Sequence, residues 1–192
     1  MLKIVFKNYK GMAFAIPLFV LLGCGLNIGT IKQGIYSNPA TGFYIKDVPF
    51  FPQTRYYCGP ASLASVMNYY GLSVTEEEIA KEIYITKLSG TLPMDILRYA
   101  RTKGLDGLYY KGSIDDIKKH ISMGRPVILF LDLGYAVYPL RHYIVATGYN
   151  DEMGYLIAHS GREKEKVFSY KQIQEAWGKT GFGTILVTPK GK

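Results

Sequence analysis

The sequence predicts one α+β domain with an antiparallel sheet, because helical patterns come first along the chain and strand patterns follow them. Apolar residues recur with helical spacing between residues 58 and 124, whereas short apolar runs bounded by turn residues dominate after residue 126. Helices and strands segregated in this way are typical of an α+β fold. The chain of 192 residues, 48% of them hydrophobic and 20% charged, is long enough for a substantial core.

Residues 1–23 have the composition of a signal peptide. Positive charges come first, and an apolar run over residues 12–22 follows them; it is shorter than the about 20 residues of a membrane-spanning helix. The run ends in Leu21-Leu22-Gly23-Cys24, which resembles a bacterial lipobox, in which cleavage precedes a cysteine that is then lipidated. An ordinary signal peptide and an uncleaved anchor are the alternatives. The positive charges are those of Lys3, Lys7 and Lys10.

The lipobox sets the expected location of the protein and the state of its second cysteine. A protein lipidated at Cys24 is held by its lipid on a membrane of the bacterial cell envelope, and Gly25 favours the outer membrane, on its periplasmic face, in a cell that has one. Lipid on Cys24 also leaves Cys58 without a disulfide partner, since the chain has two cysteines. Residues 24–43 have no sustained period and are expected to form a tether, the alternative for part of them being a first strand docked on the domain.

The distribution of charge argues against nucleic-acid binding, and the sequence motifs argue against a metal or cofactor site. Three lysines lie in the first 23 residues, which contain no acids, so the formal net charge of +8 falls to +5 beyond them. No cluster of lysine and arginine with interleaved aromatics indicates a nucleic-acid partner. The three histidines lack metal-ligand spacing, and no glycine-rich nucleotide motif is present, so we expect no metal and no cofactor.

The domain, residues 44–192, is expected to begin with an extended stretch and four helices. Two prolines favour extended geometry over residues 45–53. Each helix has its own start signal: Pro60 in the first turn, Ser73 or Thr75 as an N-cap with glutamate three residues later, Pro93, and Ser113 as a further cap. Glycines at 71, 104 and 124 end the first, third and fourth helices.

Strand patterns fill most of the second half. The continuous apolar run over residues 127–131 predicts a central strand. A loop rich in Gly, Pro and Tyr, residues 132–141, separates it from a second strand, and a turn leads to a hairpin partner. The remaining expected elements are strands over residues 142–149, 155–159 and 184–188, a solvated connection over 160–166, and a helix with Trp177 over 169–178.

Cys58 stands at the expected N-terminus of the first helix, and this position suits a nucleophile. The free N–H groups and the positive end of the helix dipole favour a thiolate. The helix has one expected buried face, formed by Leu63, Val66, Met67 and Tyr70.

Two other residues complete a candidate site. His142 follows the irregular loop at the start of a strand, where an imidazole can take the thiol proton and form a thiolate–imidazolium pair. Gln53, upstream of Cys58, is placed to donate a side-chain N–H to the oxyanion of a tetrahedral intermediate, beside the N–H of Cys58. Each residue alone has a structural interpretation, and it is their order along the chain that favours catalysis.

Two stretches carry a family resemblance. VPFFPQTRYYCGPASLASVMNYYG, residues 48–71, and HYIVATGYN, residues 142–150, resemble the bacteriocin-processing double-glycine peptidases, which are papain-like cysteine peptidases. The resemblance extends from about residue 47 to 187 and implies a helical half with the nucleophile packed on an antiparallel sheet with the base. It matches Gln53 to the oxyanion glutamine, Cys58 to the nucleophile and His142 to the general base. With the lipobox, it implies a stand-alone lipoprotein that hydrolyses peptide bonds after small residues such as Gly-Gly.

The sequence departs from that family at the residue that orients the base. The family places an Asp after the His hairpin, whereas this chain has His159 or Ser160 there, neither with a carboxylate. Ser160 can accept the ring N–H at its hydroxyl oxygen, and Asp132 and Asp151 are rival orienters. The missing carboxylate motivates a second hypothesis, an inactive peptide-binding module on the same fold. An acyltransferase is a third.

The loop before the base is the expected wall of the substrate cleft. Its residues Tyr135, Tyr138 and Arg141 stand close to His142 in the sequence. The alternative is that they only fill the core and the loop.

Overall fold

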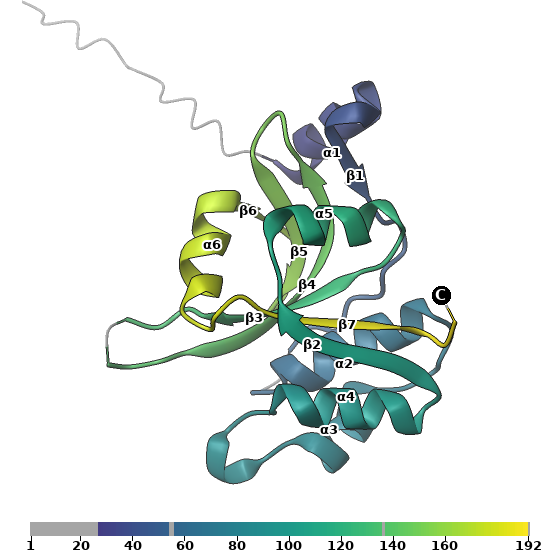
Figure 1. The fold of residues 1–192 in the computed structure, drawn as a ribbon, viewed down its shortest axis with the longest axis vertical. Helices are drawn as coiled ribbons and strands as arrows, with labels where there is room; N and C mark the ends of the chain where they lie inside the picture. The colour runs from purple at the N-terminus through teal and green to yellow at the C-terminus, as the bar shows by residue number, and fades with distance from the viewer. Residues whose placement is uncertain (1–26, 54–55, 136, 192) are drawn as a thin grey trace, which may run out of the picture.

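The computed structural model describes residues 27–53, 56–135 and 137–191, and its centre is an antiparallel sheet. Seven strands of these residues form the sheet in the order β2-β7-β3-β4-β5-β6, and β1 pairs with the half of β4 that β3 does not reach (Figure 1). The strands are β1 (Gly42–Tyr44), β2 (Leu105–Lys111), β3 (Val127–Asp132), β4 (Arg141–Asn150), β5 (Tyr155–Ser160), β6 (Glu163–Ser169) and β7 (Gly183–Pro189).

The helices form two groups around this sheet. Three of them lie together in the lower half of Figure 1, and the last two flank the strands in its upper half. The lower group is α2 (Cys58–Tyr69), α3 (Glu76–Ile83) and α4 (Pro93–Thr102); the upper pair is α5 (Ile114–Ser122) and α6 (Tyr170–Gly178); α1 (Ile28–Ser37) precedes β1. The group α2–α4, which precedes most of the antiparallel sheet in the chain, confirms the predicted α+β class.

Helix α2 is the centre of the helical half. Every residue from Gly59 to Met67 is buried, because α2 packs against β4 on one side and against α3 and α4 on others. The expectation of a single buried face was therefore too narrow: small residues such as Ala61, Ala64 and Ser65 fill the other faces. A helix surrounded on all sides holds its first residue in a fixed place.

The predicted helix ends are confirmed, and Thr75 is the N-cap of α3 where Ser73 was the other candidate. Thr75 and Glu78 form a capping box at α3, and the Ser113 hydroxyl accepts the N–H of Asp116 at α5. Gly71, Gly104 and Gly124 all have positive φ just after α2, α4 and α5. These residues stop their helices because glycine enters the left-handed region without steric cost.

The predicted tether, residues 24–43, is wrong for residues 28–37 and 42–43. Residues 28–37 form α1, and residues 42–44 form the docked strand β1 that was the alternative. Ile31 and Ile35, one helical turn apart, are buried with Ile157 of β5 in a small cluster of their own. Two apolar residues are too few for a periodic pattern, so only the tertiary contact reveals the helix. The folded unit therefore includes residues before 44.

Two edge strands were also missed. No element was expected over β2, and the region of β6 was interpreted as a solvated connection up to residue 166. Most side chains of both strands are exposed or half-buried, and Leu105 is the fully buried residue of β2. Their pairing with β7 and β5 is made by backbone groups, which leave no hydrophobic signature in the sequence.

Within the described residues, no helix is long and apolar enough to cross a membrane. The predicted signal peptide and the lipidation site Cys24 lie outside the described residues.

Candidate active site

Cys58 is the first residue of α2 and lies against the start of β4. Burial raises the pKa of its thiol, while the backbone N–H groups of Tyr143, Gly59 and Cys58 itself oppose this by favouring the thiolate. The N–H of Tyr143 belongs to the residue that follows His142. The structure thus brings the predicted nucleophile to the strand that holds the predicted base. Cys58 forms no disulfide with any residue that the structure describes.

The start of α2 is packed tightly against the loop before α4. A Cβ atom added at Gly59 would lie 2.9 Å from the Cβ of Thr91, so no larger residue fits without movement. The Tyr143 hydroxyl donates to the Thr91 carbonyl at 2.9 Å. Tyr143 therefore connects β4 to the helical half twice, through its hydroxyl at Thr91 and through its backbone N–H at the sulfur of Cys58. Sequence reasoning missed both residues, because the Tyr143 N–H and the Thr91 carbonyl are backbone groups and the contacts of the two side chains depend on the tertiary packing.

His142 is the second residue of β4 and is held by Ser160 at the end of β5. The distance between its Nε2 and the Ser160 Oγ is 3.1 Å. Burial lowers the pKa of His142 to about 4, and the positive charge of Lys166 on β6 adds to this effect. A neutral imidazole that donates its Nε2–H to Ser160 has an unprotonated Nδ1, which is the form a general base needs.

His159, the other candidate orienter, is part of the structural frame instead. Its Nε2 lies 3.0 Å from the Val48 carbonyl, and its Nδ1 accepts the N–H of Glu165 at 3.1 Å. These bonds fix Nε2 as the protonated nitrogen and occupy both ring nitrogens. The ring is buried and meets Phe50 edge to face, with centroids 5.3 Å apart. Ser160, and not His159, is the residue that contacts His142.

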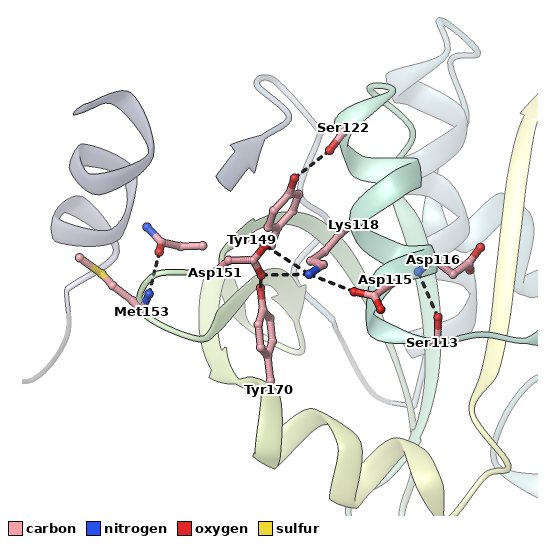
Figure 2. Close-up of polar contacts among 10 residues, drawn as sticks. Ser113, Asp115, Asp116, Lys118, Ser122, Tyr149, Asp151, Met153 and Tyr170 are labelled. Atoms are coloured by element: carbon pink, nitrogen blue, oxygen red, sulfur yellow. Dashed lines mark hydrogen bonds and ion pairs between the residues drawn. The ribbon is translucent and has the colours of Figure 1, made fainter. Parts of the chain in front are cut away.

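The two rival carboxylates face other partners. One oxygen of Asp132 accepts the N–H groups of Gly134 and Leu140, both at 2.9 Å, and the other lies 3.6 Å from the guanidinium of Arg141. Asp151 is bound by Lys118 and by the hydroxyl of Tyr170 (Figure 2). Neither carboxylate is therefore the partner of His142.

Gln53 is placed by the turn that follows Ser160. Its N–H donates to the Gly161 carbonyl at 3.0 Å, and its own carbonyl lies 3.5 Å from the Nε of Arg162. Gln53 also lines a small hollow with Ser62 of α2 and with Ser160. The backbone of Gln53 is thus pinned beside the first turns of α2 and beside Ser160, the residue that contacts His142.

The β3–β4 loop projects from the body of the molecule at the end where β4 begins (Figure 1). Asp132 fixes its base, and Tyr135 and Tyr138 at its tip are 86% and 81% exposed. These two rings do not fill the core, so that part of the alternative is wrong for them. Arg141, half-exposed, pairs with Asp132 one residue before His142.

No group of three or more metal-ligating side chains gathers anywhere in the described ranges. The chemistry that the site offers is that of a half-buried thiol, an imidazole in contact with a hydroxyl, and backbone N–H groups at a helix start.

Comparison with known sequences places this arrangement in a family. The sequence model of the Peptidase_C39 like family matches residues 45–185. The chain belongs to the Peptidase C39-like family. This C39-like chain is also 39% identical over 69 residues to an uncharacterized protein from Methanothermobacter thermautotrophicus. That match covers 35% of the chain and about half, 48%, of the relative.

Solved structures agree with the family and the fold. The peptidase domain of Streptococcus ComA, a bifunctional ABC transporter, is 25% identical, with a TM-score of 0.63 over 75% of this chain and 100% of that domain. A C39-like peptidase from Bacillus anthracis (16% identity, TM-score 0.66, 79% and 99% covered) shares the fold. So does a double-glycine motif protease from an AMS/PCAT transporter, solved with a leader peptide (20%, 0.62, 77% and 95%). The predicted papain-like fold of a cysteine peptidase is confirmed.

Proposed function

We propose that this protein hydrolyses peptide bonds with Cys58 as nucleophile and His142 as general base. The observation on which the proposal rests is the contact between His142 Nε2 and Ser160 Oγ, because an imidazole that donates its Nε2–H to Ser160 has Nδ1 free to accept a proton. The sulfur of Cys58 meets the N–H of Tyr143, the residue that follows His142 on β4, and this supports the pairing of the two. Membership of a peptidase family supports the same reaction.

The proposed reaction has two halves. The thiol proton passes to Nδ1 of His142 as the sulfur attacks the substrate carbonyl carbon, and the resulting oxyanion accepts the N–H of Cys58 and a side-chain N–H of Gln53. The C–N bond then breaks, and the imidazolium gives its proton to the leaving amine. In the second half His142 takes a proton from water, which attacks the thioester and releases the acid and the Cys58 thiol.

The substrate in this proposal is a peptide or protein cut after small residues such as Gly-Gly. A structural neighbour was solved with a leader peptide, which supports a peptide ligand. Tyr135, Tyr138 and Arg141 are the proposed wall of the substrate cleft. Replacing both tyrosines by alanine should raise KM for a peptide severalfold and leave the unfolding midpoint unchanged, because both rings are exposed. An unchanged KM would remove these residues from the proposal.

We also propose that Cys24 carries lipid and holds the protein on a membrane of the bacterial cell envelope. The lipobox sequence is the support for this. Cys24→Ala should move the protein from the membrane fraction to the soluble fraction of the expressing cell. Continued membrane retention of this variant would favour an uncleaved anchor instead.

One experiment separates a peptidase from an inactive peptide-binding module. The full-length protein is incubated with a peptide aldehyde or vinyl electrophile at pH values from 5 to 9, beside His142→Ala and, as a blank, Cys58→Ala. We expect wild-type labelling to exceed that of His142→Ala most strongly below pH 8, where a thiol without a base is protonated. Equal rates in wild type and His142→Ala, both following a free-thiol profile, would argue for the binding module.

A second measurement separates hydrolysis from acyl transfer. Peptides with internal Gly-Gly are incubated with the protein in the presence and absence of a small primary amine, and products are identified by mass. Free carboxylic acids in both samples support the peptidase. Amides formed in preference to acids would support the acyltransferase, which uses the same thioester.

A further inference from the structure

Glu165 on β6 has an unusual backbone conformation close to the candidate site. Its φ is +56°, in the left-handed region that residues other than glycine rarely adopt. Such a conformation persists where surrounding contacts fix it, and it is often found next to functional sites. Glu165 is half-buried, so its surroundings are those of the folded protein and not of solvent alone.

Three side chains hold Glu165 in place. Its N–H donates to Nδ1 of His159 at 3.1 Å, which fixes the backbone. One carboxylate oxygen binds Nζ of Lys32 on α1 at 2.6 Å, and the other accepts the hydroxyl of Tyr44 on β1. The Lys32 Nζ also lies 4.0 Å from the centroid of the Tyr44 ring. Lys32 and Tyr44 both precede residues 45–185, the part of the chain that the family model matches.

The pairing of β5 with β6 is irregular at this point. Ala158 pairs with Lys166, but Ser160 pairs with Glu163, so two residues of β6 oppose His159 alone. This is a β-bulge, which bends the strand and changes the direction of the side chains beside it. The residue immediately beside it is Ser160, whose hydroxyl contacts His142.

The turn beyond the bulge also holds Gln53. The Gly161 carbonyl accepts the Gln53 N–H, so Ser160 and Gly161 place the base and the oxyanion residue together. A shift of the bulge would therefore move both at once. Polar contacts run from Lys32 through Glu165 to His159, and His159 directly precedes Ser160 in the chain.

We infer that Lys32 is a positioning residue: through Glu165 it fixes the bulge that sets Ser160 against His142 and the turn against Gln53. The inference rests on the proposed function, in which these two contacts serve peptide hydrolysis. It makes the docking of α1, which precedes the family domain, a requirement for full activity. The competing view is that the Lys32–Glu165 pair only adds stability.

The test compares Lys32→Met with a matched control, Lys118→Met. Both lysine side chains are 23% exposed and paired with carboxylates, but Lys118 binds Asp115 and Asp151 between α5 and the β4–β5 turn (Figure 2). We expect Lys32→Met to lower kcat about fivefold to tenfold with KM within about twofold, as for the loss of a hydrogen bond of ordinary strength. Lys118→Met should leave both constants unchanged.

A spectroscopic measurement makes the test independent of turnover. The chain has three histidines, so the ring ¹⁵N and N–H signals of His142 can be assigned by substitution. The His142 Nε2–H signal should move in Lys32→Met and stay in place in Lys118→Met. Unchanged His142 signals together with unchanged kcat in Lys32→Met would overturn the inference. If the wild-type protein cleaves no peptide, the proposed function is contradicted but this inference is not, because the His142 signal still reports whether Lys32 affects the position of His142.

A rescue experiment distinguishes positioning from stability. Glycine adopts the left-handed conformation without a side-chain partner, so Glu165→Gly should keep the bulge and nearly wild-type kcat even in combination with Lys32→Met. If the pair only stabilises the fold, the double variant loses at least as much activity and stability as Lys32→Met. If Lys32→Met does not fold, the single variant Glu165→Gly serves in its place. It is compared with Glu165→Ala, which loses the same carboxylate without gaining the conformational freedom of glycine. A nearly wild-type kcat in Glu165→Gly beside an about fivefold to tenfold lower kcat in Glu165→Ala supports the inference, and equal kcat values in the two variants would overturn it.

Discussion

The Oγ atom of Ser160 lies 3.1 Å from the Nε2 atom of His142, so a hydroxyl orients the imidazole where the double-glycine peptidases resembled by the sequence have a carboxylate. A hydroxyl can select the tautomer, but it brings no negative charge to stabilise the imidazolium. This agrees with the pKa of His142, which burial lowers to about 4. Ser160 can thus orient the ring of His142 without stabilising the positive charge of the imidazolium, and substitutions of Ser160 can test the two effects separately.

Replacement of Ser160 by Asp should raise the pKa of His142 well above 4, because a carboxylate beside the ring favours the imidazolium. Ser160→Asn brings an acceptor without charge and should leave the pKa low. Ser160→Ala removes the acceptor and should lower kcat about tenfold, the effect of one lost hydrogen bond. Titration of the His142 ring by ¹⁵N NMR measures the first two. Coincident titration of the Asp and Asn variants would contradict the expected effect of charge.

Lys166 offers a second way to change the same pKa. Burial is the larger cause of the low pKa of His142, and the positive charge of Lys166, which disfavours the imidazolium, is the second. Lys166→Met should therefore raise the pKa of His142 and increase Cys58 labelling near pH 6. Lys171→Met is the control, since Lys171 lies on the exposed surface of α6 and pairs with Glu175 at 3.9 Å. The comparison needs only pH-dependent labelling rates. A change of equal size in both variants would mean a general effect of net charge.

Removal of the Gln53 amide should affect the chemical step and not binding. We expect Gln53→Ala to lower kcat about 10²-fold to 10³-fold, as loss of one oxyanion donor does in other enzymes, with little change in KM. Gln174→Ala on the exposed side of α6 is the matched control. Steady-state kinetics with one peptide substrate suffice. A loss expressed mainly in KM would assign Gln53 to substrate binding.

The lowered pKa of His142 also predicts how stability depends on pH. Between about 6.5, the ordinary value, and about 4, the unfolded chain binds a proton that the folded protein does not. The free energy of unfolding should therefore fall as pH decreases through this window, by at most about 1.4 kcal/mol per pH unit for this group. His142→Gln should show a shallower decrease in urea unfolding from pH 7 to 4. Parallel curves for the two proteins would show that His142 is not protonated differently on folding.

The sequence was sufficient for the elements with strong local signals. The capping box at Thr75, the glycines that end α2, α4 and α5, and the apolar run of β3 are properties of neighbouring residues, and all were predicted. The elements that were missed lack such signals. Helix α1 depends on two isoleucines that meet β5 far along the chain, and β2 and β6 are paired through backbone groups.

The same distinction holds for the site. Cys58, His142 and Gln53 were predicted as site residues from residue type and order. The structure places His142 at the start of β4, Cys58 at the start of α2 against that strand, and Gln53 beside Ser160. The choice between Ser160 and His159 depends on which face of β5 each occupies next to a bulge, and the sequence does not specify the bulge. The effect of Lys166 on the pKa of His142 depends on the pairing of β6 with β5, which the sequence did not predict either.

The burial of Cys58 has a consequence for the chemical durability of the protein. Peroxides and other oxidants attack the thiolate far faster than the thiol, and oxidation beyond the sulfenic acid is irreversible for most proteins. Because burial raises the pKa of Cys58 while it lowers that of His142, the resting pair is biased toward the neutral thiol and imidazole. Cys58 should therefore survive millimolar hydrogen peroxide longer at pH 7 than at pH 9, and a substitution that raises the pKa of His142 should shorten that survival.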